Sequence, residues 1–307
     1  MSFSKDTKKE LCGAPVQSVE EKKALAYGML LFSRVFTPKA IALTTECHEA
    51  ALYYAECLSS MTTAIVDMTV SLTRRKSGEK SYNLSIPDTG DCERIYDLFG
   101  HNAGALSLRI NRSNIDEEGT IPCFLRGAFL VCGNVSDPGK DYHLEFAVPH
   151  MNLAKDLSRV ISETGILPAE PKMVRRKGSY IVYIKGSDGI ADMLTYMGAP
   201  MAALETMQQK IYKSVRNKVN RQINSETANS NKTALASARQ LAAIQKIIRH
   251  KGLQSLPDDL RELAQLRMDN PEFNLRELGE ALSQPISRSG VNHRLMRIME
   301  IADTIDT

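Results

Sequence analysis

Apolar and polar positions along the first two hundred residues follow a pattern that predicts an ordered series of helices and strands. Long apolar runs at 20–36 and 123–135 predict two helices, and each has a glycine in its interior, Gly28 and Gly127. A glycine inside a helix is less favourable than alanine by about 0.5–1 kcal/mol. We therefore expect another backbone segment to approach closely at both glycines.

The two glycine-containing helices begin two copies of one unit, at about 20–100 and 119–200. The two glycines are 99 positions apart, and a second pair of similar segments, 74–86 and 175–184, begins 101 positions apart. Recurrence at nearly one spacing indicates a duplication. Each copy is predicted to contain a helix, a strand, an amphipathic helix, a β-hairpin and a short helix, in that order.

After the first helix, the predicted elements of the two copies correspond one to one. In the first copy they are a strand at 40–45, a helix at 47–61, a hairpin turning at 76–80 and a helix at 91–100. In the second copy they are a strand at 142–149, a helix at 151–165, a hairpin turning at 177–179 and a helix at 188–198. We expect an α+β pseudo-dimer in which the two glycine-containing helices pack against each other.

The C-terminal residues follow the helical period. Predicted helices lie at 231–252, 258–269, 274–282 and 287–303. Asn274 and Ser287 are residues of the type that caps helix N-termini, and a short turn at 283–286 separates the last two helices. Two helices joined by a tight turn are the arrangement of a DNA-binding helix-turn-helix.

The last predicted helix has an apolar stripe, Val291, Leu295 and Ile298, that we expect to face the bundle. Its other positions are candidates for contact with double-stranded DNA, because the N-terminal residues of a recognition helix reach base edges. The base-contact candidates are Arg288, Ser289, Asn292 and His293, and the phosphate-contact candidates are Arg294 and Arg297. Ser287 is a further candidate for contact with DNA. The alternative is a small helical bundle with a solvated polar face.

Charge divides the C-terminal third into a basic and an acidic part, although the net charge of the whole chain is only +3. Residues 206–257 contain ten lysines and arginines against one acid, whereas residues 258–307 contain six arginines against ten acids. The basic excess predicts a surface for phosphates. Its candidate DNA contacts are Lys210, Lys213, Arg216, Lys218, Arg221, Asn224, Asn229 and Lys232. A solvated linker with a basic face is the alternative.

Other features of the composition exclude several classes of protein. The six cysteines are scattered without a C-x-x-C pair, so we expect neither a zinc site nor a disulfide framework. No apolar run reaches 18 residues, and the first residues lack the apolar core of a signal peptide. We therefore expect a cytoplasmic, nucleoid-associated protein that has no membrane partner and no cofactor or metal.

The segment LRGAFLVCG at 125–133 resembles the LAGLIDADG helix of homing endonucleases. In that family an acid near the end of each such helix holds the divalent metal over the scissile phosphates. The matching positions here are Cys132 and, in the first copy, Ser33, and neither is a hard anionic ligand. The resemblance therefore implies the scaffold of a DNA-cleaving enzyme without catalytic residues, unless Asp137 or Glu145 reaches the site. A simple core helix is the alternative.

Segments from most of the chain resemble the WhiA family of bacterial regulators. The matching stretches are 124–146, 220–233, 255–267 and 275–295. That family joins a degenerate LAGLIDADG-like domain to a C-terminal helix-turn-helix. The resemblance implies a DNA-binding transcription regulator, without enzymatic activity, that is involved in cell division, chromosome segregation or sporulation.

These expectations divide the chain into four segments. They are an N-terminal arm at 1–19, a degenerate LAGLIDADG-like domain at 20–202, a basic linker helix at 203–230 and a helix-turn-helix domain at 231–307. The expected partner is double-stranded DNA, with a second regulatory protein as a further partner of the LAGLIDADG-like domain. A metal-dependent endonuclease is the alternative function, and the residues Ser33 and Cys132 oppose it.

Overall fold

The computed structural model describes the chain except for residues 1, 73–79, 103, 106 and 307. The chain forms two compact units, Met1–Lys213 and Ser214–Thr307, and helix α8 (Pro200–Lys251) belongs in part to each. In the described part of the chain, no helix combines the length and the apolar character needed to cross a bilayer.

The first unit contains two copies of one arrangement, preceded by helix α1 (Phe3–Gly13). The first copy consists of α2 (Val19–Leu31), β1 (Val35–Thr37), β2 (Ala40–Thr45), α3 (His48–Thr62), β3 (Asp67–Leu72), β4 (Lys80–Ser85) and α4 (Thr89–Leu98). After the short 3-10 helix η1 (Arg112–Asn114), the second copy consists of α5 (Thr120–Cys132), β5 (Gly133–Val135), β6 (His143–Val148), α6 (Met151–Glu163), β7 (Lys172–Arg176), β8 (Ser179–Lys185) and α7 (Ser187–Met197).

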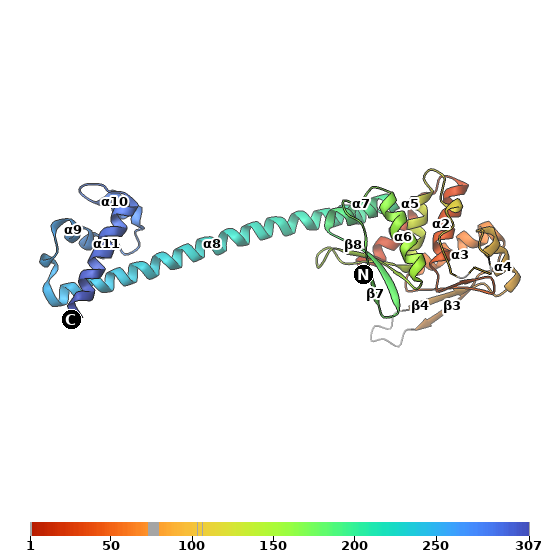
Figure 1. Cartoon of the computed structure of the whole chain (residues 1–307), viewed down its shortest axis with the longest axis horizontal. Coiled ribbons are helices and arrows are strands. Elements are labelled where there is room, and N and C mark those ends of the chain that lie inside the picture. The colour runs from red at the N-terminus through yellow and green to blue at the C-terminus, as the bar shows by residue number, and fades with distance from the viewer. Residues whose placement is uncertain (1, 73–79, 103, 106, 307) are drawn as a thin grey trace. The chain divides into compact units, whose positions relative to one another are not determined.

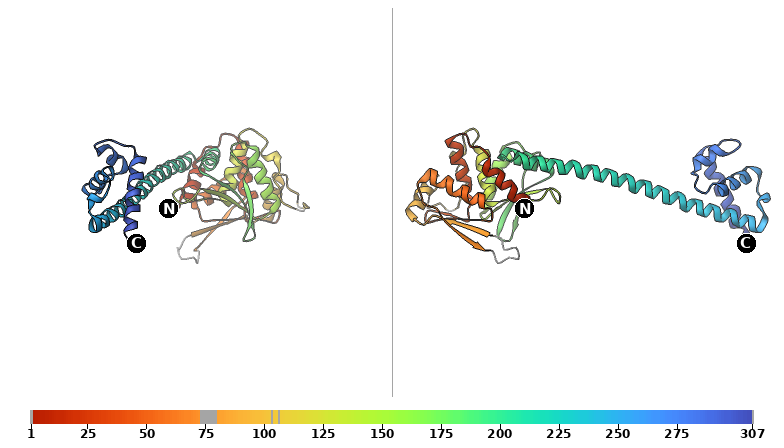
Figure 2. Two further views of the ribbon diagram at one scale, coloured as in Figure 1. Left: turned by 60° about the vertical axis from the view of Figure 1, so that its left-hand side comes forward. Right: turned by 180° about the vertical axis from the view of Figure 1, so that it is seen from behind.

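The two copies have the same sheet topology. Each has a four-stranded antiparallel sheet, with strand orders β1-β2-β4-β3 and β5-β6-β8-β7. Along β6, Leu144, Phe146 and Val148 are buried and the residues between them are not. Helices therefore cover one face of each sheet, as Figure 1 and Figure 2 show. The predicted α+β class is confirmed, and its two copies are visible in the structure.

The structure adds two short strands to the predicted units. The first helix was expected to continue to residue 36, but α2 ends at Leu31 because Val35–Thr37 pairs with β2. In the second copy, Gly133 ends α5 and begins β5, which pairs with β6. A strand of three residues carries too little periodic signal to be recognised in the sequence.

One of the two predicted hairpin turns lies in the described part of the chain. Most of the turn expected at 76–80, and the start of the repeated segment at 74–86, fall on residues 73–79, outside the described part of the chain, while Lys80 begins β4. The turn between β7 and β8 is observed, and Lys177 and Gly178 both have positive φ there. Two consecutive residues with positive φ match the right-handed twist of the strands in a tight hairpin.

Helices α2 and α5 cross with their backbones in contact at the two glycines. A Cβ atom on Gly28 would overlap the carbonyl oxygen of Phe124 and lie 3.0 Å from the amide nitrogen of Ala128. A Cβ atom on Gly127 would overlap the carbonyl oxygen of Leu25 in the same way. The close backbone approach that the sequence predicted is therefore present at both glycines, each against the opposite helix.

The N-terminal residues form helix α1, which packs into the first unit. Leu11 on this helix is fully buried, and Thr7 is buried beside it. The Glu10 carboxylate accepts hydrogen bonds from the backbone amides of Met201 and Ala202, at 2.7 and 3.0 Å. Because these amides are at the start of α8, Glu10 satisfies donors that the helix leaves free and faces the positive end of its dipole.

The second unit is a helical bundle built on the C-terminal part of α8. The elements that follow are η2 (Leu253–Ser255), α9 (Asp258–Asp269), α10 (Leu275–Ala281), α11 (Arg288–Asp303) and η3 (Thr304–Asp306). The core includes Ile244 and Ile247 from α8, Leu260 and Leu263 from α9, Leu278 from α10, and Val291, Leu295 and Ile298 from α11. The predicted inward stripe of the last helix is therefore buried.

Local hydrogen bonds define where the helices of this bundle begin and end. The Asn274 side chain accepts from the amide of Glu277, whose carboxylate accepts in return from the amide of Asn274, and the two bonds form a capping box. The Ser287 hydroxyl accepts from the amide of Gly290. Gly252, with φ of 75°, follows the end of α8. Of these residues, Ser287 borders the turn between α10 and α11 and fixes where that turn ends.

Replacing Gly28 with alanine is expected to destabilise the first unit by about 3 kcal/mol, because the added methyl group must push two backbones apart. The higher helix propensity of alanine offsets only about 1 kcal/mol of this cost. Urea unfolding followed by circular dichroism measures the difference. Gly13→Ala is the matched control, since a Cβ atom there meets nothing within 4 Å. Equal stabilities of the two variants would contradict a tight crossing.

Candidate nucleic-acid interface

Helix α11 presents one polar face to solvent. Its exposed side chains include those of Arg288, Ser289, Asn292, His293 and Arg297. Their spacing places Ser289, His293 and Arg297 opposite the buried stripe of the same helix, whereas Arg288 and Asn292 lie beside that stripe. The capping residue Ser287 is exposed as well, and its hydroxyl lies 2.9 Å from that of Ser289. The candidate base contacts therefore share one accessible surface at the start of the helix.

Arg294 lies apart from this surface. Its guanidinium faces α9, where Nε is 3.5 Å from a carboxylate oxygen of Asp259. The Arg294 side chain is about one quarter exposed, whereas Arg288 and Arg297 are exposed residues. In this arrangement Arg294 links two helices of the bundle, and it would have to leave Asp259 to contact a phosphate.

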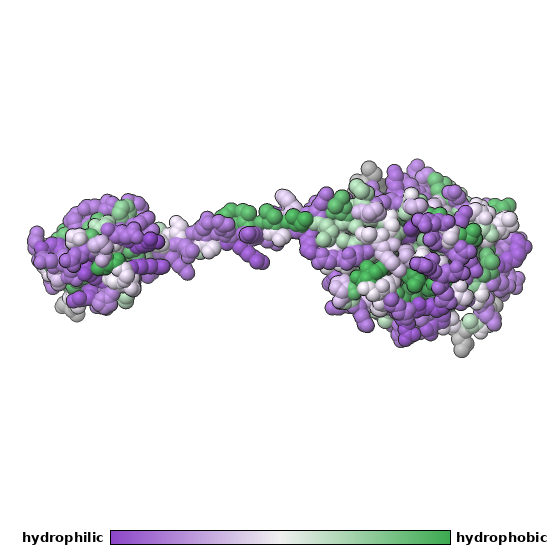
Figure 3. Space-filling view, turned by 90° about the horizontal axis from the view of Figure 1, so that it is seen from above, coloured by the Kyte–Doolittle hydropathy of each residue, from purple (hydrophilic) through white to green (hydrophobic). Residues whose placement is uncertain are grey.

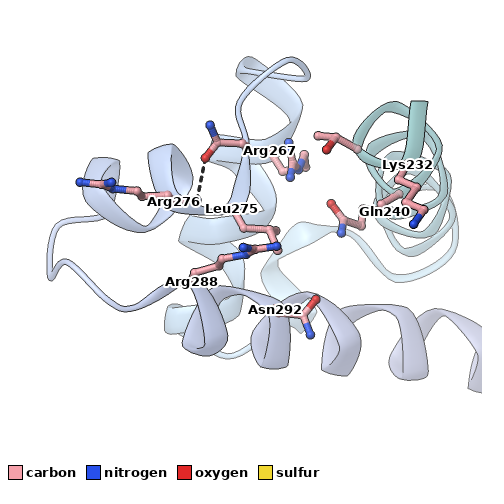
Figure 4. A pocket seen from close by; sticks show the side chains of 10 residues that line it. Lys232, Gln240, Arg267, Leu275, Arg276, Arg288 and Asn292 are labelled. Carbon is pink, nitrogen blue, oxygen red and sulfur yellow. Dashed lines mark hydrogen bonds between the residues drawn. The ribbon is translucent and has the colours of Figure 1, made fainter. Parts of the chain in front are cut away.

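A cavity of about 520 Å³ opens beside the start of α11, between α8, α9 and α10 (Figure 4). Lys232 of α8 lies in its wall together with Arg288 and Asn292 of α11. The structure therefore brings together residues that the sequence assigned to two separate groups, a basic helix and a recognition helix. Arg276 also lines the cavity, but its side chain points away and pairs with Glu280 at 2.8 Å.

The basic residues of α8 fall into two groups. Lys210 pairs with Asp188 at 2.6 Å, and the Lys213 ammonium lies 4.5 Å from the centre of the Tyr142 ring. Both are thus held by the first unit. The remaining candidates Arg216, Lys218, Arg221, Asn224, Asn229 and Lys232 are exposed.

The same part of α8 carries exposed apolar side chains. Figure 3 shows apolar residues gathered along this helix. They include Ile211, Val215, Val219 and Ile223, each about half exposed or more. Their spacing of four residues forms an apolar stripe beside the exposed cations.

The positions that match the metal ligands of the LAGLIDADG helices hold groups unsuited to a hard cation. Ser33 is buried, and its hydroxyl donates a hydrogen bond to the carbonyl oxygen of Met29 at 2.7 Å. Burial raises the pKa of the Cys132 thiol to about 12, so the sulfur stays protonated near neutral pH. Magnesium prefers anionic oxygen ligands, and neither group supplies one.

Lys8, on helix α1, is a charged residue of this region that the sequence analysis did not identify. Its ammonium is close enough to Cys132 that each group shifts the pKa of the other, and it lies 5.9 Å from the centre of the Phe129 ring. Burial lowers the pKa of Lys8, while the thiols around it act in the opposite direction. Only the packing of α1 brings this side chain to the end of α5, so no local pattern could have indicated it.

The acids considered as replacements do not form a metal site in the part of the chain that the structure describes. Glu145 instead pairs with His143, with a carboxylate oxygen 3.0 Å from Nε2 of the ring. Asp137 accepts a hydrogen bond from the amide of Gly139. Among the described residues, no three histidine, cysteine or acidic side chains are grouped so that they could hold a metal ion.

A duplicated α+β unit whose central helices cross at two glycines, followed by a helical bundle with an exposed recognition-type helix, defines a LAGLIDADG-like and helix-turn-helix protein. The model of the WhiA LAGLIDADG-like domain matches residues 121–216, and the model of the WhiA C-terminal HTH domain matches residues 219–302. The chain belongs to the WhiA family.

Relatives of known sequence and structure extend this similarity over the whole chain. Proteins named "probable cell division protein WhiA" from Thermoanaerobacter pseudethanolicus and Clostridium perfringens are each 36% identical to it, over 98% and 100% of this chain and 97% and 99% of their own. The crystal structure of "full-length DUF199/WhiA from Thermatoga maritima" has a TM-score of 0.59 and 24% identity, with 99% of both chains covered. That structure supports the same fold.

The thiols of Cys12, Cys57 and Cys132 are expected to react very slowly with a disulfide reagent in the folded protein at pH 8. Burial raises the pKa of Cys12 and Cys132 to about 12 and that of Cys57 to about 11. Because the thiolate is the reactive form, and only about one in ten thousand of the Cys12 and Cys132 thiols is ionised at pH 8, labelling should be slow. The measurement is absorbance of the released thiolate, before and after unfolding in urea. Rapid labelling of Cys132 in the native protein, located by peptide mass, would contradict its burial.

Proposed function

We propose that this chain is a DNA-binding transcription regulator without enzymatic activity, and that it acts in cell division, chromosome segregation or sporulation. In this proposal α11 enters the major groove of double-stranded DNA, and the exposed cations of α8 contact the backbone. A protein with this activity is expected at the nucleoid in the cytoplasm. The involvement in cell division rests on the names of relatives that cover the full length of the chain.

The exposed polar face of α11 is the observation that supports this proposal most directly. Arg288 and Asn292 are the side-chain types that make bidentate contacts with guanine and adenine, respectively. They project from the first turns of a helix whose other face is anchored in the core. The N-terminal turns of a recognition helix are the part that reaches base edges.

For the LAGLIDADG-like unit we propose a binding role instead of a catalytic one. The unit retains the paired helices and sheets of a DNA-cleaving scaffold, but Ser33 and Cys132 stand where the metal ligands would be needed, and Lys8 adds a cation. A positive charge beside the end of α5 opposes binding of a divalent cation. These observations disfavour the alternative of a metal-dependent endonuclease and leave the unit as a surface for a regulatory protein or for DNA.

Replacing Arg288 and Asn292 with alanine, singly, is expected to weaken sequence-specific DNA binding by about 1–3 kcal/mol each and to relax the preference at one base position. The measurement is selection of genomic fragments by the purified full-length protein in Mg²⁺, followed by affinity measurement on the shared motif. The fragments are examined for strand breaks at the same time.

Arg159→Ala is the matched control for Arg288→Ala, because it removes an exposed arginine from α6 of the first unit. It is expected to leave the selected motif unchanged. Selection of no motif by the wild-type protein would overturn the proposed function, and fragments cut in Mg²⁺ would restore the endonuclease alternative.

The exposed cations of α8 are expected to set the salt dependence of binding without setting its sequence preference. If each of the four cations Arg216, Lys218, Arg221 and Lys232 contacts one phosphate, the logarithm of the DNA-binding constant should fall with the logarithm of the salt concentration with a slope of about −3 to −4. The double variant Lys218→Ala, Arg221→Ala is expected to reduce this slope by about 2 for all sequences. Lys210→Ala, whose ammonium already pairs with Asp188, should change it less. Equal effects of the two variants would contradict the division of these cations into two groups.

A further inference from the structure

Arg267, on α9, carries a buried charge that the bundle does not neutralise. The residue is only 2% exposed, and no ion pair involves it among the residues that the structure describes. Its Nη1 donates to the carbonyl oxygen of Phe273 at 2.6 Å, but its buried Nε has no hydrogen-bond partner. Burying a cation without an anionic partner is costly unless another group compensates for it.

The surroundings of Arg267 do not provide that compensation. Burial lowers the pKa of its guanidinium, and the nearby Glu272 offsets this only in part. Glu272 is an exposed residue and does not line the cavity. The charge of Arg267 is therefore directed into the cavity without an acid opposite to it.

Gln240, on α8, is a second buried polar group in the same cavity with an unpaired atom. It is 7% exposed, and its side-chain oxygen has no hydrogen-bond partner. Figure 4 shows Gln240 and Arg267 pointing toward each other from opposite walls, with Arg288 and Asn292 below them. Rotation of the terminal amide exchanges its oxygen and nitrogen, so Gln240 can present a donor to a ligand at this place.

The charge around the cavity contrasts with the charge of the chain segment that forms most of it. Residues 258–307 contain ten acids and six arginines. Three of these arginines line the cavity, at 267, 276 and 288, together with Lys232 from α8, and no acid lines it. Arg267, Arg288 and Lys232 thus place positive groups around one concave site, whereas the side chain of Arg276 points away from it and pairs with Glu280.

We propose that this cavity is a binding site for a phosphate group, with Arg267 as its buried cation, Gln240 as a hydrogen-bonding partner, and Lys232 and Arg288 at its rim. The proposal rests on the proposed function, because it places one phosphate beside the residues assigned to base contact. The phosphate can belong to the DNA backbone or to a small phosphorylated molecule, which would then compete with DNA for Arg288. Charge-assisted hydrogen bonds from guanidinium groups are the strong contacts that phosphates receive.

Gln240→Glu tests this site with a change that keeps the size of the side chain. The new carboxylate can pair with Arg267, so we expect no loss of thermal stability, while its charge repels a phosphate. DNA binding by the full-length variant should weaken about tenfold at ~0.1 M salt, and the salt slope should fall by about 1. Gln245→Glu is the matched control, because it makes the same change at an exposed position of α8 outside the cavity.

A second measurement distinguishes the two sources of the phosphate. Inorganic phosphate is titrated into the wild-type protein and both variants at constant ionic strength, and the melting temperature and DNA affinity are recorded. Stabilisation of the wild type and of Gln245→Glu but not of Gln240→Glu, with competition against DNA, supports a site for a free phosphorylated molecule. A reduced salt slope in Gln240→Glu without an effect of free phosphate supports a site for the DNA backbone.

Equal behaviour of Gln240→Glu and Gln245→Glu in both measurements would overturn the phosphate site, while DNA binding by the wild type would leave the proposed function intact. Lys232→Gln provides a second variant at an exposed position, where unfolding of the bundle is not expected. It should act in the same direction as Gln240→Glu. An unchanged salt slope for this variant would also count against the site.

Discussion

The close crossing of α2 and α5 is the constraint on which the first unit depends. Because peptide groups meet at Gly28 and Gly127, backbone sterics and not side-chain packing set the distance between the two helices. Each helix leads almost directly into the sheet of its own copy, and in the second copy Gly133 ends the helix and begins the first strand. The crossing therefore positions both sheets, and the glycines are required because any side chain there would separate the copies.

The same scaffold keeps its paired helices although other groups occupy the positions that match the metal ligands of the LAGLIDADG helices. A divalent metal needs anionic oxygens, and the two positions beyond the crossing offer a hydroxyl that donates to its own helix and a thiol that stays protonated. Lys8 places its amino group in this neighbourhood, where burial lowers its pKa. None of these groups takes part in the crossing, so the replacement leaves the paired helices intact.

Much of this architecture could be predicted from the sequence, because its determinants are local or repeated. The duplication follows from glycine spacing, and the ends of α10 and α11 follow from Asn274 and Ser287, whose caps act within a few residues. Features that depend on contacts between distant segments could not be predicted. They include the strands β1 and β5, whose register is set by neighbouring strands, and the ion pair that turns Arg294 toward α9. The cavity around Arg267 belongs to this group too, since its walls come from four helices.

The distribution of charge in the second unit affects how the bundle would be oriented on DNA as well as how tightly it would bind. Acids outnumber arginines over 258–307, so this segment of the bundle repels a DNA backbone, whereas the part of α8 in the second unit carries an excess of cations. The arginines and Lys232 that line the cavity lie beside the start of α11, and they form the place where a phosphate can approach without meeting an acid. If DNA binds there, the acids of 258–307 disfavour orientations that bring them to the duplex, and attraction at this site places the first turns of α11 against the groove. In this way the buried guanidinium of Arg267, which has no anionic partner within the bundle, would favour the orientation that brings a phosphate to the cavity.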